Sequence, residues 1–160
     1  MEHRQRIEEQ LKKQFDEKIR SVTTDLGDIV IQVQKESVAE VLGFLKHKPQ
    51  DYSMLLDLTC VDNKGKKPRF EMVYHIFSLS KNHRLRIKCR VPEQDLKVES
   101  LCSLWKNANW LEREVYDMFG IQFSGHPDLR RLFMYHGFEG YPLRKDYPLR
   151  KRQPKIRLRK

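Results

Sequence analysis

Residues 84–91 place the strongest constraint on the fold, because apolar and basic side chains alternate along the whole segment. Successive side chains of a β-strand point to opposite faces of a sheet, so this segment predicts a strand. The apolar residues 69–79 precede it and are separated from it by SKNH, which suits the loop of a hairpin. We therefore predict an antiparallel pair with one apolar face, Leu85, Ile87, Cys89 and Val91, and one basic face, Arg84, Arg86, Lys88 and Arg90.

The basic face of this hairpin allows two interpretations. Cations on one strand face can bind a phosphate backbone. Alternatively, the face is solvated, and the long Arg and Lys stems cover apolar neighbours such as Val73 and Phe77 on the paired strand. The second interpretation is favoured, because solvated basic faces are the more common case.

The segments before this hairpin predict two helices and further strands. An apolar residue every four positions indicates an amphipathic helix through Ile7, Leu11, Phe15 and Ile19. Residues 20–25 and 29–34 flank the turn DLGD and predict a short hairpin. A second helix begins where Ser37 and Glu40 fit a capping box, and Pro49 follows it. Its apolar face is Val38, Val41, Leu42 and Leu45, and the next strand has an expected face of Met54, Leu56, Leu58 and Cys60.

Two helices are predicted after the hairpin. The first is short and has its apolar residues, Val98, Leu101, Cys102 and Trp105, at helical spacing. The second, NWLEREVYDMFG, has Asn109 and Glu112 in capping-box positions and ends at Gly120. Leu111, Val115 and Met118 form its apolar stripe, so its acids are expected mostly off the buried side. Arg113 and Asp117 are four residues apart and are expected to pair. A strand and then a loop follow.

Charge is concentrated at the C-terminal end. The formal net charge is +10, of which residues 144–160 carry +8. Such a tail can bind phosphates, anionic lipid or an acidic protein groove, and composition does not choose among them. Apolar runs are far below the roughly 18 residues of a membrane helix. The start lacks a secretion signal and a transit peptide, so we expect a cytosolic, bacterial-type chain.

Catalytic and metal-binding patterns are weak. The three cysteines are widely spaced, which predicts small core residues rather than a zinc or iron–sulfur site. Paired carboxylates could support glycoside hydrolysis, and a histidine among carboxylates could bind a metal. However, HExxH spacing, a Gly-rich phosphate loop and a nucleophile elbow are all missing from the sequence. Acids interleaved with arginines suit charge-paired recognition at least as well.

WLEREVYDMFGIQFSGHPDLRRL, followed by GFEGYPLRKDYPL, resembles the signature of the 30 kDa subunit family, or C subunit family, of respiratory complex I, the proton-pumping NADH:quinone oxidoreductase, and of related membrane-bound hydrogenase subunits. Agreement is strongest over residues 110–149. The sequence departs from the family pattern at Tyr141, where a histidine is usual, and at residues 133–136.

The resemblance implies an α+β fold of two layers, with helices on a mixed sheet in the order α-β-β-α-β-β-β, then a helix and an extended C-terminal arm. It implies a core domain over residues 1–120 and an arm and basic tail over residues 121–160 that contact partner subunits. The expected interface residues are Glu112, Arg113, Glu114, Asp117, His126, Asp128, Arg130, Arg131, Arg144, Lys145 and Asp146.

The implied role is a non-catalytic subunit of the peripheral arm, docked against the quinone-site subunit (the D subunit of the complex) and near iron–sulfur subunits. This chain is expected to hold no cofactor, while other subunits hold NADH, FMN, iron–sulfur clusters and quinone. It is expected on the cytoplasmic side of the inner membrane, with membrane contact only through the complex and no nucleic acid bound. The alternatives are a small basic RNA-binding protein, a hydrogenase-type subunit and a carboxylate hydrolase.

Overall fold

The computed structural model describes residues 2–154 and has an α+β fold, as predicted. One mixed five-stranded sheet forms the centre, and a short two-stranded sheet lies beside it. In chain order the elements are α1 (Glu2–Phe15), β1 (Ile19–Asp25), β2 (Asp28–Val33), α2 (Val38–Lys46), β3 (Met54–Asp62), β4 (Phe70–Ser78), β5 (His83–Val91), β6 (Lys97–Glu99), α3 (Ala108–Phe119) and β7 (Gln122–Ser124), with short 3-10 turns at Asp16–Lys18 and Lys35–Ser37.

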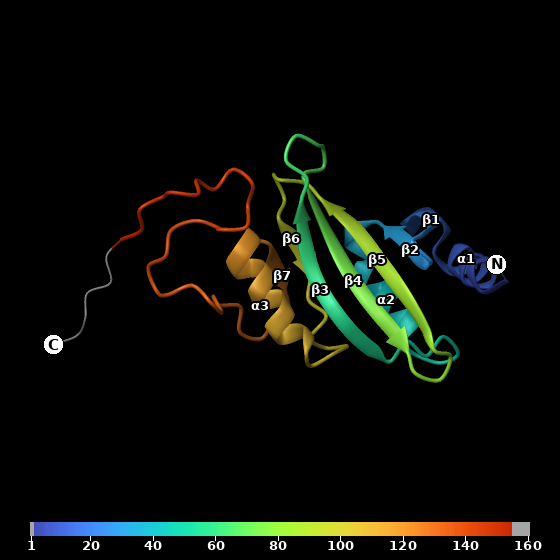
Figure 1. Ribbon diagram of the computed structural model, residues 1–160. Coiled ribbons are helices and arrows are strands. Elements are labelled where there is room, and N and C mark those ends of the chain that lie inside the picture. The colour runs from blue at the N-terminus through green and yellow to red at the C-terminus, as the bar shows by residue number, and fades with distance from the viewer. Residues whose placement is uncertain (1, 155–160) are drawn as a thin grey trace.

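The strand order of the large sheet is β1-β2-β5-β4-β3. Both predicted hairpins are confirmed, since β1 pairs antiparallel with β2 and β4 pairs antiparallel with β5. The contact between β2 and β5 is parallel, and α2 lies in the crossover between these strands. The sheet therefore brings the two hairpins side by side (Figure 1).

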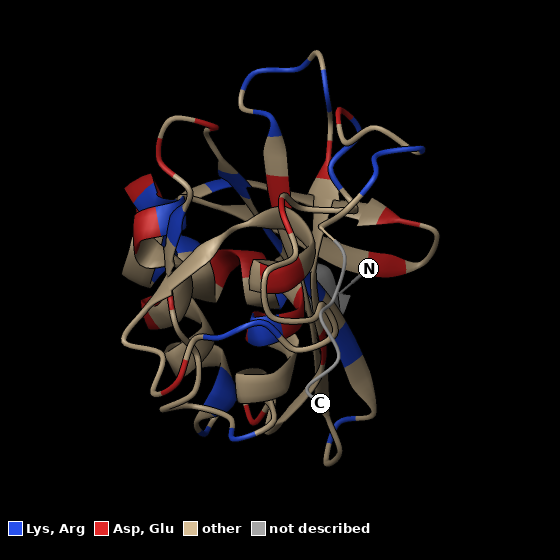
Figure 2. Cartoon of the chain, turned by 90° about the vertical axis from the view of Figure 1, so that its left-hand side faces the viewer, with Lys and Arg blue, Asp and Glu red and all other residues tan. Residues whose placement is uncertain are grey.

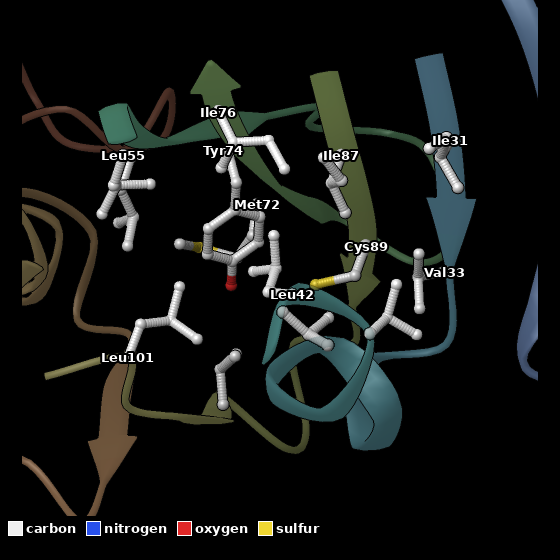
Figure 3. Close-up of a cluster of buried hydrophobic side chains, with 14 of the residues drawn as sticks. Ile31, Val33, Leu42, Leu55, Met72, Tyr74, Ile76, Ile87, Cys89 and Leu101 are labelled. Atoms are coloured by element: carbon white, nitrogen blue, oxygen red, sulfur yellow. The ribbon is translucent and has the colours of Figure 1, made fainter. Parts of the chain in front are cut away.

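The core lies between the inner face of the sheet and α2. The apolar face predicted for α2 is fully buried, and so is the predicted inner face of β5. Figure 3 shows Leu42 of α2 facing Ile31, Tyr74 and Ile87 of the strands. Burial of such side chains contributes about 1.5–3 kcal/mol each, so this layer stabilises the fold. Among residues 2–154, no helix has the length and hydropathy required to cross a membrane.

Four predictions about the segments before α3 were wrong. The helix α1 ends at Phe15, and Ile19 starts β1 instead of extending it. The capping box of Ser37 does not form, because the Ser37 side chain makes no capping hydrogen bond and Glu40 pairs with Lys18 at 2.6 Å. In β3, an irregularity between Leu55 and Asp57 shifts the register, so Leu55 and Leu58 are buried while Met54 and Leu56 are about 40% exposed.

The fourth wrong prediction is the helix through residues 98–105. Val98 lies in β6, which pairs in parallel with β7 and places Val98 opposite Phe123. Leu101 and Trp105 are still buried, but from turns rather than from a helix. Trp105 donates its indole N–H to the Ser53 carbonyl at 2.8 Å, which fixes this segment beside the start of β3. Tertiary pairing thus overrode a helical spacing of apolar residues.

The outer face of the hairpin is charged but mostly ion-paired. Arg86 lies 2.9 Å from Asp28, and Lys88 lies 3.2 Å from Glu71. Val73 beneath them is only 6% exposed. This arrangement agrees with basic stems covering apolar neighbours and leaves fewer free cations for a phosphate backbone.

Candidate functional site

The first part of the family signature, WLEREVYDMF, lies in α3, and Gly120 ends this helix. Gly120 has φ +77°, in the left-handed region, and donates its N–H to the Tyr116 carbonyl at 2.9 Å. The ring of Tyr141 lies directly over its Cα, so a Cβ at this position would be 2.5 Å from the ring. Glycine is therefore required twice, for the backbone conformation and for the close approach of the arm.

Asp117 on α3 is fully buried, and it holds the start of the arm. The Arg131 guanidinium lies 2.8 Å from one carboxylate oxygen, and the backbone N–H groups of Leu132, Phe133 and Met134 donate to the other at 2.8–3.1 Å. Burial alone would raise the pKa of Asp117, but these donors outweigh it and lower the pKa. The carboxylate thus stays charged and fixes the chain over residues 131–134.

Two arginines complete this attachment of the arm. Arg113 donates to the backbone carbonyls of Arg130 at 3.1 Å and Arg131 at 3.2 Å, and its guanidinium lies over the Trp110 ring. Arg131 also donates to the Gly140 carbonyl at 3.0 Å. The predicted pair between Arg113 and Asp117 was therefore wrong, since Asp117 pairs with Arg131 instead.

Glu112 was expected to cap α3 and lie off the buried side, but the structure buries it completely. Its carboxylate accepts from the Ser100 hydroxyl at 2.7 Å and from the Leu101 N–H at 2.6 Å. Burial raises the pKa of Glu112, and these hydrogen bonds offset only part of the effect. Glu112 therefore connects α3 to the turn after β6. The predicted cap at Asn109 was wrong, because Asn107 is the residue that precedes the helix.

Cys102, Glu112 and His126 place one potential metal-ligand atom each within 4.8 Å of one another. Both ring nitrogens of His126 are engaged, however: the Asp128 N–H donates to Nδ1 at 3.0 Å, and Nε2 lies 3.1 Å from the Asn109 carbonyl. A metal would have to displace one of these bonds. The geometry therefore favours a hydrogen-bonded cluster that fixes the loop after β7.

A second attachment point for the arm is Arg69, which is 8% exposed and lies at the start of β4. Its guanidinium pairs with Asp62 at 2.7 Å, with Glu93 at 2.6 Å and with Asp146 of the arm at 2.7 Å. The hydrogen bonds to Arg69 hold the pKa of Asp62 and of Asp146 below their usual values. The ends of β3, β4 and β5 and the arm thus meet at one cation.

Arg144 and Lys145 lie between these two points. Arg144 donates to the Phe119 carbonyl at 2.7 Å, and its guanidinium lies over the rings of Tyr141 and Phe70. The backbone N–H of Lys145 donates to Asp62 at 2.8 Å, while its side chain is exposed. Residues 131–134 and 140–146 are therefore attached to the chain's own core. Figure 1 shows the segment as orange to red loops beside α3.

The predicted interface residues fall into two groups. Glu114, Asp128, Arg130 and the Lys145 side chain are exposed, and Arg130 pairs with Asp128 at 2.8 Å. Most of the others are used inside the chain, in the contacts to Asp117, Glu112 and Arg69. Four carboxylates of this segment were weighed for a hydrolytic role. Glu112 and Asp117 are buried and hydrogen-bonded within the chain, whereas Glu114 and Asp128 are exposed.

Three residues of this second attachment point were not among the predicted site residues: Asp62, Arg69 and Glu93, which lie at or next to strand ends. Ile121 and Phe123, which follow the predicted domain boundary at residue 120, are buried among the core residues. The sequence did contain a signal for Asp62 and Arg69. Each is a charged residue at the end of an apolar segment, and the two have opposite charges on either side of one loop.

Comparison with known proteins gives consistent matches. A family model described as "Respiratory-chain NADH dehydrogenase, 30 Kd subunit" matches residues 31–153. The C subunit of NADH-quinone oxidoreductase from Geobacter sulfurreducens is 45% identical over 140 residues, which cover 87% of this chain and 86% of that protein. The corresponding protein of Trichlorobacter lovleyi is 48% identical over 145 residues, covering 90% and 89%.

Two solved structures share the fold. The trypsin-resistant fragment (1–134) of Nqo5 has a TM-score of 0.67 and 31% identity, and the match covers 78% of this chain and 99% of the fragment. A chain of the membrane-bound sulfane sulfur reductase, an archaeal respiratory membrane complex, has a TM-score of 0.77 over 93% of this chain and 87% of its own. Its identity is 21%, so this second likeness concerns the fold alone.

Proposed function

The chain belongs to the family of the 30 kDa subunit of respiratory-chain NADH dehydrogenase, and from this membership we propose that it is a structural subunit of the peripheral arm of that complex and docks against the quinone-site subunit. Its relatives are subunits of NADH-quinone oxidoreductase, an oxidoreductase complex. In this proposal the chain does no chemistry of its own. It supports electron transfer from NADH to quinone by holding other subunits in place.

One observation carries the proposal: the arm is fixed on the core while three of its large apolar side chains are exposed. Phe133 is 61% exposed, Leu143 is 53% exposed and Leu149 is 98% exposed. The backbone between the first two is held by Asp117, by Arg131 and, at Leu143, by an N–H bond to the Met118 carbonyl. A loop ordered before binding loses less conformational entropy when a partner covers it.

The exposed charged residues beside the arm suit the rim of such an interface. Glu114 of α3 and three residues of the arm, Asp128, Arg130 and Lys145, are exposed and carry charges of both signs. Rim charges set orientation and association rate more than affinity. We assign the docking energy chiefly to Phe133 and Leu143, and specificity to these charges.

The proposal assigns NADH, FMN, iron–sulfur clusters and quinone to other subunits. It also assigns the chain to the cytoplasmic side of the membrane, reached only through the complex. A second candidate is the equivalent subunit of a related complex of the hydrogenase type, which the fold shared with the sulfane sulfur reductase chain favours.

The test replaces the exposed apolar residues of the arm. Phe133→Ser with Leu143→Ser should leave circular dichroism unchanged, since neither side chain is in the core, but should reduce the amount of quinone-site subunit that co-purifies with the tagged chain. Leu26→Ser is the matched control, because Leu26 is 97% exposed in the turn between β1 and β2. Turnover per assembled complex should stay normal. Full assembly of the double variant would reject docking through the arm.

A further inference from the structure

The turn between β3 and β4 carries a group of lysines that the proposed docking residues do not include. Lys64, Lys66 and Lys67 are all exposed, and they line a hollow of about 530 Å³. Pro68 and Pro92 form part of its apolar wall, and Glu93 lies on its rim. Figure 2 shows this turn as the blue loop at the top of the molecule.

A fourth lysine joins them from the arm. The backbone N–H of Lys145 donates to Asp62 at the end of β3, which places residue 145 at the base of the turn. The charge of Lys64 also acts on the neighbouring Asp146. We call the side chains of Lys64, Lys66, Lys67 and Lys145 the lysine surface.

The lysine surface differs from the other basic surface of the molecule in its pairing. On the outer face of the sheet, Arg86 and Lys88 have carboxylates of the chain within 3.3 Å. Within residues 2–154, by contrast, none of the lysine-surface ammonium groups forms an ion pair. The nearest acids, Asp62, Glu93 and Asp146, all pair with Arg69 instead.

The base of this surface is fixed by those same ion pairs. Arg69 joins Asp62, Glu93 and Asp146, so the two ends of the turn and the arm are held together. The Asn63 N–H also donates to the Arg69 carbonyl at 2.9 Å. Flexible ammonium groups therefore project from a fixed base next to the arm.

We infer that the lysine surface binds an acidic segment of a neighbouring subunit in the assembled complex. The inference rests on the proposed function, because it places a second contact beside the arm. Unpaired ammonium groups complement a run of Asp and Glu side chains. The rim residues Glu93 and Gln94 offer acceptors for backbone N–H groups of such a segment.

The chemistry of the hollow favours a protein segment over a phosphate. The one guanidinium here, Arg69, already binds carboxylates, so a bidentate fork for phosphate is not free. The apolar wall that Pro68 and Pro92 form suits a peptide better than a phosphate group. Anionic lipid, whose headgroup carries a phosphate, is the competing ligand that the experiments below test.

The first experiment uses carbodiimide cross-linking of the purified whole complex. This reagent joins a lysine amine to a carboxylate only when the two are in direct contact. Peptide mapping should find Lys64, Lys66 or Lys67 joined to Asp or Glu of another subunit. Cross-links from these lysines confined to their own chain would overturn the inference.

The second experiment reverses the charges with K64E, K66E and K67E together. Binding of the chain to purified subunits of the complex should weaken on the order of tenfold, because several individually weak exposed pairs are reversed. The salt dependence of binding should also become shallower. The control is K13E, R20E and K48E, which makes the same charge change at exposed positions on other elements and should bind normally.

The outcomes separate this inference from the proposed function. Normal binding of the lysine variant alongside loss of binding by the Phe133 and Leu143 variant would reject the lysine surface and keep docking through the arm. Normal binding by both would reject both. Flotation of the wild-type chain, but not of K64E, K66E and K67E, with phosphatidylglycerol vesicles, together with no cross-link to another subunit, would show a lipid site and overturn the acidic segment.

Discussion

At the scale of single residues, α3 buries two carboxylates in opposite electrostatic states. Asp117 has Arg131 and several N–H donors, and its pKa is lowered. Glu112 has a hydroxyl and one backbone N–H, no Lys or Arg pairs with it among the described residues, and its pKa is raised. Asp117 therefore stabilises the folded state when it is charged, whereas Glu112 stabilises the folded state when it is neutral.

Asp117→Asn should destabilise the protein by about 3–5 kcal/mol, because it removes the buried charge that Arg131 and the arm require. Urea unfolding followed by circular dichroism measures the change. Asp128→Asn is the control, since Asp128 is exposed, and we expect a change within about 0.5 kcal/mol. Equal stability of the two variants would contradict the role given to Asp117.

Glu112→Gln should become more stable relative to the wild type as pH rises. The folded pKa of Glu112 is raised above its ordinary 4.5, so its contribution to stability is full below 4.5 and is lost as pH rises through the folded pKa. Glutamine has no such loss and keeps an acceptor for the Leu101 N–H. The free energy of unfolding, measured from acidic to neutral pH for both proteins, should diverge. Parallel curves would mean that folding does not change the pKa of Glu112.

At the scale of elements, the hydrophobic period predicted the hairpins, α2 and α3, because each of these segments buries one regular face. It failed where long-range pairing decided the structure. The shift in β3 comes from its register with β4, and β6 forms only because β7, more than twenty residues later, pairs with it. Glu112 was placed outside because a carboxylate on a helix is usually solvated, and its partners Ser100 and Leu101 come from a turn the sequence did not reveal.

Gly120→Ala tests the junction of α3 and the arm. The substitution combines the strain of positive φ with a collision with the Tyr141 ring, so we expect a loss above the roughly 1–3 kcal/mol of strain alone. Gly65→Ala is the matched control, because Gly65 has φ +91° and open space around its Cα. Thermal unfolding of both variants gives the comparison. A smaller loss for Gly120→Ala than for Gly65→Ala would show that Tyr141 does not press on this site.

At the scale of the whole molecule, the arm is part of the folded chain and is also the surface offered to a partner. The family resemblance implied an extended arm, but its anchors on the core, Asp117 and Arg69, were not predicted. Those anchors join residues far apart in the chain, such as Arg69 and Asp146, which no local pattern connects. The basic charge at residues 155–160 lies outside the described residues, and its role stays a prediction.

Two truncations separate these roles of the arm. Removing residues 144–160 takes Asp146 from Arg69 but leaves Asp117 with all its donors, so the protein should remain folded with a lowered melting temperature. Removing residues 131–160 strips Asp117 of every donor the structure shows, and water then replaces the arm around its carboxylate. The packing of Met134 against the core is lost as well. This shorter chain should therefore unfold at a clearly lower temperature than the chain that ends at residue 143. If the chain without residues 131–160 unfolds at the same temperature as the chain without residues 144–160, Asp117 does not depend on the arm.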